Sequence, residues 1–160
     1  MGGILMTPSS NPILIVEDQW DKSHAIRECL IEALPNRTIR QTDTILIAGQ
    51  LISSSTWSGI VLDLSFRKTQ QVASQMNRPF LAGLEILQQL NEMRVDWPVV
   101  VATQHASFYS TRYGDFKSID DLKSMLSRAF PDNYRELIEV DLGGTDWRAA
   151  LIESTRRYFK

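Results

Sequence analysis

The sequence predicts an α/β fold, a three-layer doubly wound sandwich in which a five-stranded parallel sheet lies between helices. Short apolar runs alternate with longer segments whose apolar residues recur at helical spacing, as in consecutive βαβ units. The apolar runs are continuous and do not alternate with polar residues, so both faces of the sheet should be covered. The length of 160 residues suits one domain.

The N-terminal part supplies the first strand and helix units. Residues 13–16 are Ile-Leu-Ile-Val, a β-branched run typical of a buried strand. Residues 21–34 place their apolar side chains on one stripe at helical spacing. Residues 38–42 and 44–53 are then expected to form a short strand and a second helix.

Two further apolar runs follow in the middle of the chain. Residues 59–62 are Gly-Ile-Val-Leu, the third expected strand, which stops at Asp63. Residues 81–93 have helical periodicity. After Pro98, residues 99–103 are continuously apolar up to a terminal threonine and form the fourth expected strand.

The C-terminal third completes the alternation. Residues 120–130 are expected to be helical, and residues 137–140 to form the last strand. Two glycines then interrupt the chain, and residues 147–159 close it as an amphipathic helix.

Composition and charge exclude several classes of protein. The net charge of -2 lacks the basic excess of a nucleic-acid-binding domain. No apolar run approaches the roughly 20 residues that a membrane helix needs. A single cysteine, Cys29, excludes an internal disulfide framework and a cysteine-built metal site, and a reducing cytoplasm is the simplest location. Residues 1–11 are expected to be a flexible segment ahead of one domain, residues 12–160.

Three acidic residues directly follow predicted strands. Glu17 and Asp18 come after the first strand, and Asp63 follows the third. Because parallel strands end at the same edge of a sheet, these carboxylates should converge there. Close carboxylates raise one another's pKa, and a hard divalent cation such as Mg²⁺ removes the conflict. The alternative is that the acids merely cap the following helices.

Four segments carry a resemblance to a known family. They are Ile13-Leu14-Ile15-Val16-Glu17-Asp18, Gly59-Ile60-Val61-Leu62-Asp63-Leu64, Ala82-Gly83-Leu84-Glu85-Ile86-Leu87 and Pro98-Val99-Val100-Val101-Ala102-Thr103. In this order they resemble the receiver domain of bacterial response regulators, the CheY-like superfamily with a flavodoxin-like fold. The resemblance covers most of the chain from Pro12 onward.

The resemblance implies a role for each acidic residue. Asp63 would be the phosphoacceptor, which takes a phosphoryl group from a histidine kinase or phosphotransfer protein. Glu17 or Asp18, together with Asp63 and the backbone carbonyl of Ser65, would hold Mg²⁺. Thr103 would donate a hydrogen bond to the phosphoryl group; alternatively, it is simply a β-branched residue that suits a strand.

The chain departs from the family pattern at its last strand. The family carries a lysine there, and a register of residues 138–142 places Asp141 at that position and Ile138 at the place of the family's aromatic residue. Gln104 also stands where a small residue usually follows the threonine. The residues that would bind the metal and accept the phosphoryl group are therefore present, whereas those that would respond to phosphorylation are altered.

Two long loops leave the carboxyl ends of strands, residues 66–81 and 104–118. Such loops are usually functional or disordered. One of their cations would replace the missing lysine, or the loops would cover a degenerate site and dock another protein. Solvated loops that serve solubility are the third alternative. The candidate cations are Arg67, Lys68, Arg112 and Lys117.

The first hypothesis is therefore a stand-alone receiver in phosphorelay signal transduction. It would not be a conventional enzyme: its chemistry would be Mg²⁺-dependent self-phosphorylation at Asp63 and hydrolysis of the acyl phosphate. As the resemblance implies, output would come through contact of the fourth helix, fifth strand and fifth helix with an unknown downstream protein. No nucleic acid or membrane would be involved. The alternative is a pseudo-receiver that binds proteins independently of phosphorylation. A Mg²⁺-dependent phosphohydrolase ranks lower, since Ser65 stands where such enzymes carry a second aspartate.

Overall fold

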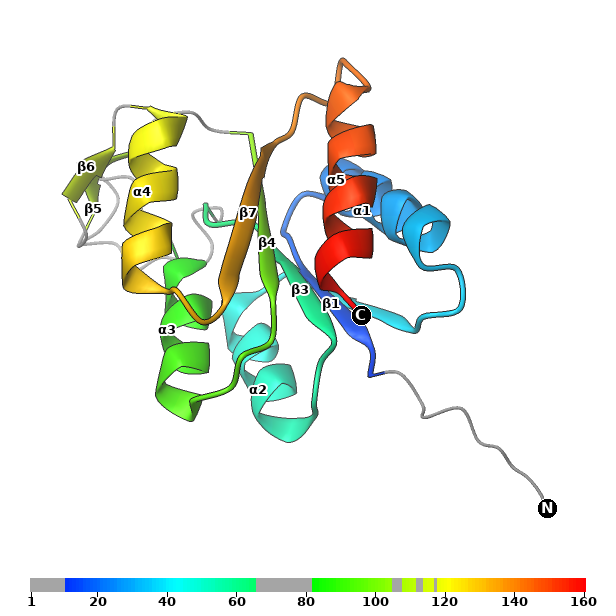
Figure 1. The fold of residues 1–160 in the computed structure, drawn as a ribbon, viewed down its shortest axis with the longest axis horizontal. Coiled ribbons are helices and arrows are strands. Elements are labelled where there is room, and N and C mark those ends of the chain that lie inside the picture. The colour runs from blue at the N-terminus through cyan, green and yellow to red at the C-terminus, as the bar shows by residue number, and fades with distance from the viewer. Residues whose placement is uncertain (1–10, 66–81, 105–107, 112–113, 117) are drawn as a thin grey trace.

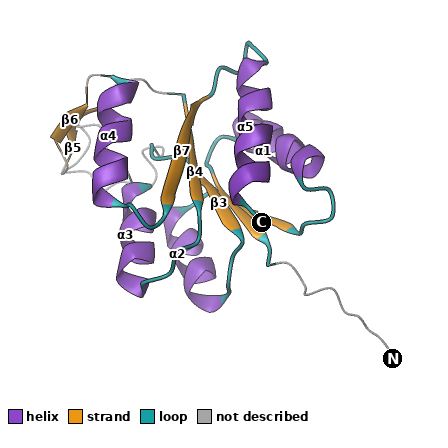
Figure 2. Cartoon of the chain, in the orientation of Figure 1, coloured by secondary structure: helices purple, strands orange, loops and turns teal. Residues whose placement is uncertain are grey.

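The predicted architecture is confirmed by a computed structural model, which describes residues 11–65, 82–104, 108–111, 114–116 and 118–160. Five parallel strands form one sheet in the order β2-β1-β3-β4-β7, and helices cover both of its faces (Figures 1 and 2). The segment predicted to be flexible, residues 1–11, lies outside the described residues except for Asn11.

The main elements follow the predicted order, and their boundaries differ from the predicted ones by at most three residues. The strands of the sheet are β1 (Ile13–Val16), β2 (Ile39–Thr42), β3 (Gly59–Leu62), β4 (Val99–Thr103) and β7 (Tyr134–Glu139). The helices are α1 (Trp20–Ala33), α2 (Ile45–Ser54), α3 (Leu84–Met93), α4 (Ile119–Ala129) and α5 (Asp146–Tyr158). Among the described residues, no helix is long and apolar enough to span a membrane.

Two features differ from the sequence-based expectations. The segment after β4 was expected to be a loop, but it contains an antiparallel hairpin, β5 (Phe108–Thr111) and β6 (Gly114–Phe116), which lies beside α4 (Figure 1). The last strand of the sheet starts at Tyr134 and ends at Glu139, so the expected bounds 137–140 and 138–142 both began and ended too late. The first three residues of β7 are only half-buried, so a search for continuous apolar runs does not identify them as part of a strand.

The sheet separates two apolar clusters because successive strand residues point to opposite faces. In β1, Leu14 and Val16 pack on the side of α2, α3 and α4, whereas Ile13 and Ile15 pack on the side of α1 and α5. All four side chains are fully buried. This explains why the strands show continuous apolar runs without alternation.

The C-terminal end of the chain closes the amino edge of the sheet. The ring of Phe159 lies against Gly59 so closely that an added Cβ would be 2.3 Å from it. Nη1 of Arg37 donates hydrogen bonds to Ser58 Oγ (2.8 Å) and to the carbonyl oxygen of Phe159 (3.3 Å). The opposite, carboxyl edge carries the acidic residues.

Candidate functional site: an acidic cluster with a buried lysine

The register of the two central strands brings the acidic residues together. Val16 of β1 pairs with Leu62 of β3, and the backbone N–H of Asp63 donates to the carbonyl of Val16 (3.0 Å). Carboxylate oxygens of Glu17, Asp18 and Asp63 consequently lie within 4.8 Å of one another. Glu17 and Asp63 are only 2% and 6% exposed, while Asp18 is half-buried. The expected convergence of the three acids is confirmed.

A buried lysine, which the sequence-based predictions did not include, completes the cluster. Lys22 lies in the first turn of α1 and is 1% exposed. Its Nζ is 2.7 Å from Glu17 Oε1 and 3.5 Å from Asp63 Oδ1. It also donates a hydrogen bond of 2.8 Å to the carbonyl oxygen of Ala102 in β4. One ammonium group therefore links α1 to both acids and to a third strand.

Helical spacing carries the signal that would have identified Lys22. It precedes Ala25, Ile26 and Cys29 by three, four and seven positions, and all three are buried on the stripe that faces the sheet. A lysine on that stripe must bring its charge into the interior and therefore needs acidic partners.

Burial controls the electrostatics of the acids. Loss of water raises the pKa of Glu17 to about 7, and the neighbouring Asp63 charge adds to this rise. The pKa of Asp63 is also raised, again mainly by burial, although the ammonium of Lys22 and the backbone N–H of Ser65 oppose the shift. The cluster thus contains more negative charge than one lysine stabilises.

The loop after β3 holds Asp63 in place through backbone contacts. The Ser65 N–H donates to Asp63 Oδ1 (3.2 Å), and the Gly83 N–H donates to the carbonyl of Leu64 (2.9 Å). A Cβ at Gly83 would lie 2.3 Å from the Asp63 carbonyl oxygen, so only glycine permits this approach. The turn before α3 therefore fixes the backbone that carries Asp63.

The remaining predicted site residues fall into two groups. Thr103 ends β4 one position after Ala102 and is fully buried. Asp141 is exposed beyond the end of β7, and its Oδ1 accepts a hydrogen bond from the Gly143 N–H (3.0 Å). Ile138 is buried on the α1 and α5 side of the sheet. The four candidate cations of the long loops, Arg67, Lys68, Arg112 and Lys117, lie outside the described side chains.

The donor set fits a hard divalent cation. Mg²⁺ prefers oxygen ligands and keeps several waters, and three converging carboxylates supply such oxygens. In the described part of the chain, the Ser65 hydroxyl oxygen is buried without a hydrogen-bond partner, which leaves a further polar atom at this edge of the sheet.

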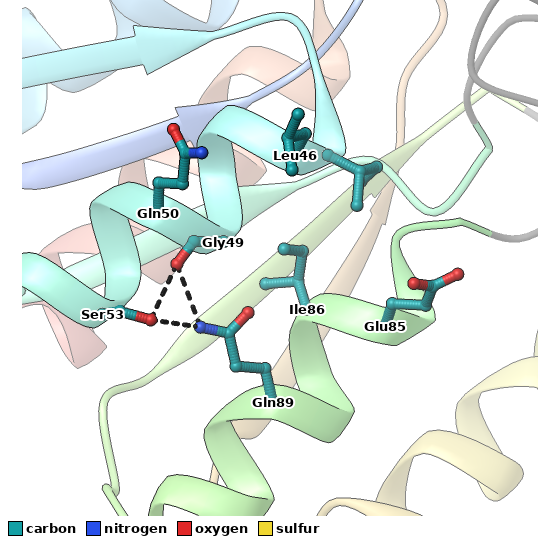
Figure 3. Close-up of a pocket in the computed structure, with 8 residues that line it drawn as sticks. Leu46, Gly49, Gln50, Ser53, Glu85, Ile86 and Gln89 are labelled. Atoms are coloured by element: carbon teal, nitrogen blue, oxygen red, sulfur yellow. Dashed lines mark hydrogen bonds between the residues drawn. The ribbon is translucent and has the colours of Figure 1, made fainter.

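A separate hollow lies between α2 and α3, and no residue of the acidic cluster lines it (Figure 3). Its volume is about 590 Å³. Across it, Nε2 of Gln89 donates to the Gly49 carbonyl and to Ser53 Oγ, both at 3.0 Å. These bonds join the two helices, and Glu17, Asp18 and Asp63 do not line the hollow.

Comparison with known proteins identifies a similar sequence. No protein-family model matches the chain. The chain is 23% identical over 145 residues to the Detocs response regulatory protein DtcB of Enterobacter cloacae (strain JD6301), an alignment that covers 88% of this chain and 95% of that protein.

Solved structures show the same fold. The signal receiver domain of a putative Luxo repressor protein from Vibrio parahaemolyticus superposes with a TM-score of 0.60 at 17% identity, covering 93% of this chain and 92% of that one. The phosphorylated cyanobacterial phytochrome response regulator RcpA gives 0.62 at 16% identity, with 93% and 94% covered. The Mn²⁺-bound response regulator Rcp1 gives 0.61 at 18% identity, with 94% and 95% covered.

Proposed function

We propose that the chain is a receiver domain of the response-regulator type, which accepts a phosphoryl group on Asp63 and signals through contact with another protein. The observation that carries this proposal is the position of Asp63, a buried carboxylate at the carboxyl edge of the sheet beside two further acids. RcpA is phosphorylated in its structure, and that precedent supports the same chemistry here.

The proposed reaction is a phosphoryl transfer between the donor and Asp63. A carboxylate oxygen of Asp63 forms a bond to phosphorus while the bond from phosphorus to the donor's histidine nitrogen breaks, and that nitrogen keeps the electron pair. The product is an acyl phosphate, which water later hydrolyses to restore the carboxylate. Such a transfer needs in-line positioning and charge neutralisation more than covalent assistance.

The residues of the chain have separate tasks in this proposal. Asp63, with Glu17 or Asp18 and the backbone carbonyl of Ser65, would hold Mg²⁺, as Rcp1 holds Mn²⁺ at a site of its own. The bound ion would neutralise charge on the carboxylates and on the incoming phosphoryl oxygens. Thr103, buried at the end of the neighbouring strand, would donate a hydrogen bond to a phosphoryl oxygen.

The partners follow from this chemistry. The donor would be a histidine kinase or a phosphotransfer protein, and the recipient of the signal a downstream protein, with no nucleic acid or membrane involved. We place the chain in the cytoplasm, where a histidine kinase presents its phosphorylated domain.

A phosphorylation-independent protein-binding module is the second candidate. The ion pairs of Lys22 favour it, because the chain itself neutralises part of the charge on Glu17 and Asp63. A site whose charge is partly neutralised in this way can keep its acids without phosphorylation.

Intact-mass analysis after incubation with acetyl phosphate and Mg²⁺ separates the two candidates. We expect one phosphoryl adduct on the parent chain and on Asp141→Asn, a control at an exposed carboxylate. Asp63→Asn and a sample treated with a chelator should give none. An unmodified parent chain would refute phosphoacceptance and favour the binding module.

A further inference from the structure

Lys22 is an unusual residue to bury. An ammonium group loses much of its hydration inside a protein, and the loss is offset only by charged partners at short distance. Lys22 has two such partners, Glu17 Oε1 at 2.7 Å and Asp63 Oδ1 at 3.5 Å. The ammonium of Lys22 therefore lies beside Asp63, the proposed phosphoacceptor.

The contacts of Lys22 also fix where its ammonium lies within the fold. The hydrogen bond to the Ala102 carbonyl places Nζ between the end of β4 and the acids. Thr103, the proposed hydroxyl donor to the phosphoryl group, is the next residue of that strand. Nζ is therefore close both to Asp63 and to the end of β4, which precedes the proposed hydroxyl donor.

The charge beyond the end of β7 is negative, opposite in sign to that of Lys22. Asp141 is exposed and hydrogen-bonded within its own turn, so the last strand offers an anion near this edge. Among the described residues, Lys22 is the cation that makes an ion pair with Asp63.

We infer that Lys22, supplied by helix α1, is the residue whose ammonium binds the phosphoryl group on Asp63, an assignment that rests on the proposed phosphoacceptance. Transfer moves negative charge from the Asp63 carboxylate onto the phosphoryl oxygens. The Lys22 side chain has a flexible four-carbon stem, so its ammonium follows this charge by a small rotation. In doing so it would exchange its contact with Glu17 for one with a phosphoryl oxygen.

The test compares Lys22→Met with Lys22→Gln, which keeps a donor for the Ala102 carbonyl but has no charge. Lys123→Met, at an exposed position of α4, is the matched control. Two quantities are measured for each chain: the rate of adduct formation from acetyl phosphate, and the affinity for Mg²⁺ by calorimetry. Thermal unfolding identifies any variant that does not fold, and the Gln variant then carries the test.

We expect both Lys22 variants to form the adduct about 10- to 100-fold more slowly, the effect of losing one charged hydrogen bond. Their Mg²⁺ affinity should be unchanged or higher, because a competing cation has been removed. The control should match the parent in both measurements.

Three results would overturn the inference. Parent-like rates in both Lys22 variants would leave phosphoacceptance intact but exclude Lys22 from it. A parallel loss of Mg²⁺ affinity and rate would show a structural role alone. No adduct on the parent chain would reject the proposed function itself, and the assignment of Lys22 with it.

Discussion

Replacing Glu17 with glutamine should stabilise the metal-free protein at high pH. Burial raises the pKa of Glu17 from 4.5 to about 7, so the folded chain holds this proton more tightly than the unfolded chain does. The stability that the proton contributes is therefore complete below about pH 4.5 and is lost as the pH rises through about 7.

The size of this effect follows from the same shift. Integrating the proton linkage from about pH 5 to about pH 8 gives a loss of about 2–3 kcal/mol in the free energy of unfolding. Glutamine resembles the protonated carboxyl and keeps an oxygen toward Lys22, so the variant avoids this loss. Parent and variant should be similar at pH 5, and the variant should be more stable by about 2–3 kcal/mol at pH 8.

Urea unfolding with a chelator present, at several pH values between these limits, measures the difference. Glu92→Gln replaces an exposed carboxylate of α3 and should change stability by less than about 0.5 kcal/mol at every pH. A Glu17→Gln variant that is less stable than the parent at pH 8, or whose advantage does not grow with pH, would refute the reasoning.

Three further predictions concern the packing around the site and the core. Gly83→Ala should destabilise the fold by about 1–3 kcal/mol in urea unfolding and slow adduct formation, because its Cβ would lie 2.3 Å from the Asp63 carbonyl oxygen; parent-like values for both would contradict this. Burial raises the pKa of Cys29 to about 11, so a thiol reagent should modify the folded chain slowly at pH 8 and the urea-unfolded chain rapidly. Equal rates in the two states would place the thiol at the surface. Phe159→Ala should lower the free energy of unfolding by about 3–5 kcal/mol, because the buried ring fills the space over Gly59. Calorimetric melting measures this loss, and an unchanged transition would show that the contact is unimportant.

The parts of the fold that sequence reasoning predicted depend on local pattern. The runs that end at Val16 and Leu62 are apolar on both faces, so they identify buried parallel strands and place the following acids at one edge. β7 was located less well because Tyr134 and the next two residues are half-buried and polar in part. The hairpin β5–β6 has no such pattern to predict it.

The position of Lys22 depends on contacts between distant segments. Its partners come from the ends of β1, β3 and β4, so its burial is settled only when these strands assemble. Local sequence shows a charged residue on a helix, which usually faces solvent. Sequence reasoning sought a replacement for the family's lysine in the long loops, whose candidate cations lie outside the described side chains. It did not consider Lys22 of the first helix, which makes ion pairs with Glu17 and Asp63.

The ammonium of Lys22 also sets the net charge of the acidic cluster. When ionised, the three carboxylates and one ammonium leave two negative charges, which a single divalent ion neutralises. Without the ammonium, three charges would remain, and a trivalent lanthanide would be the matching ion. At the proposed metal site, the positive charge of Lys22 would therefore match the remaining charge to a divalent ion such as Mg²⁺ rather than to an ion of higher charge.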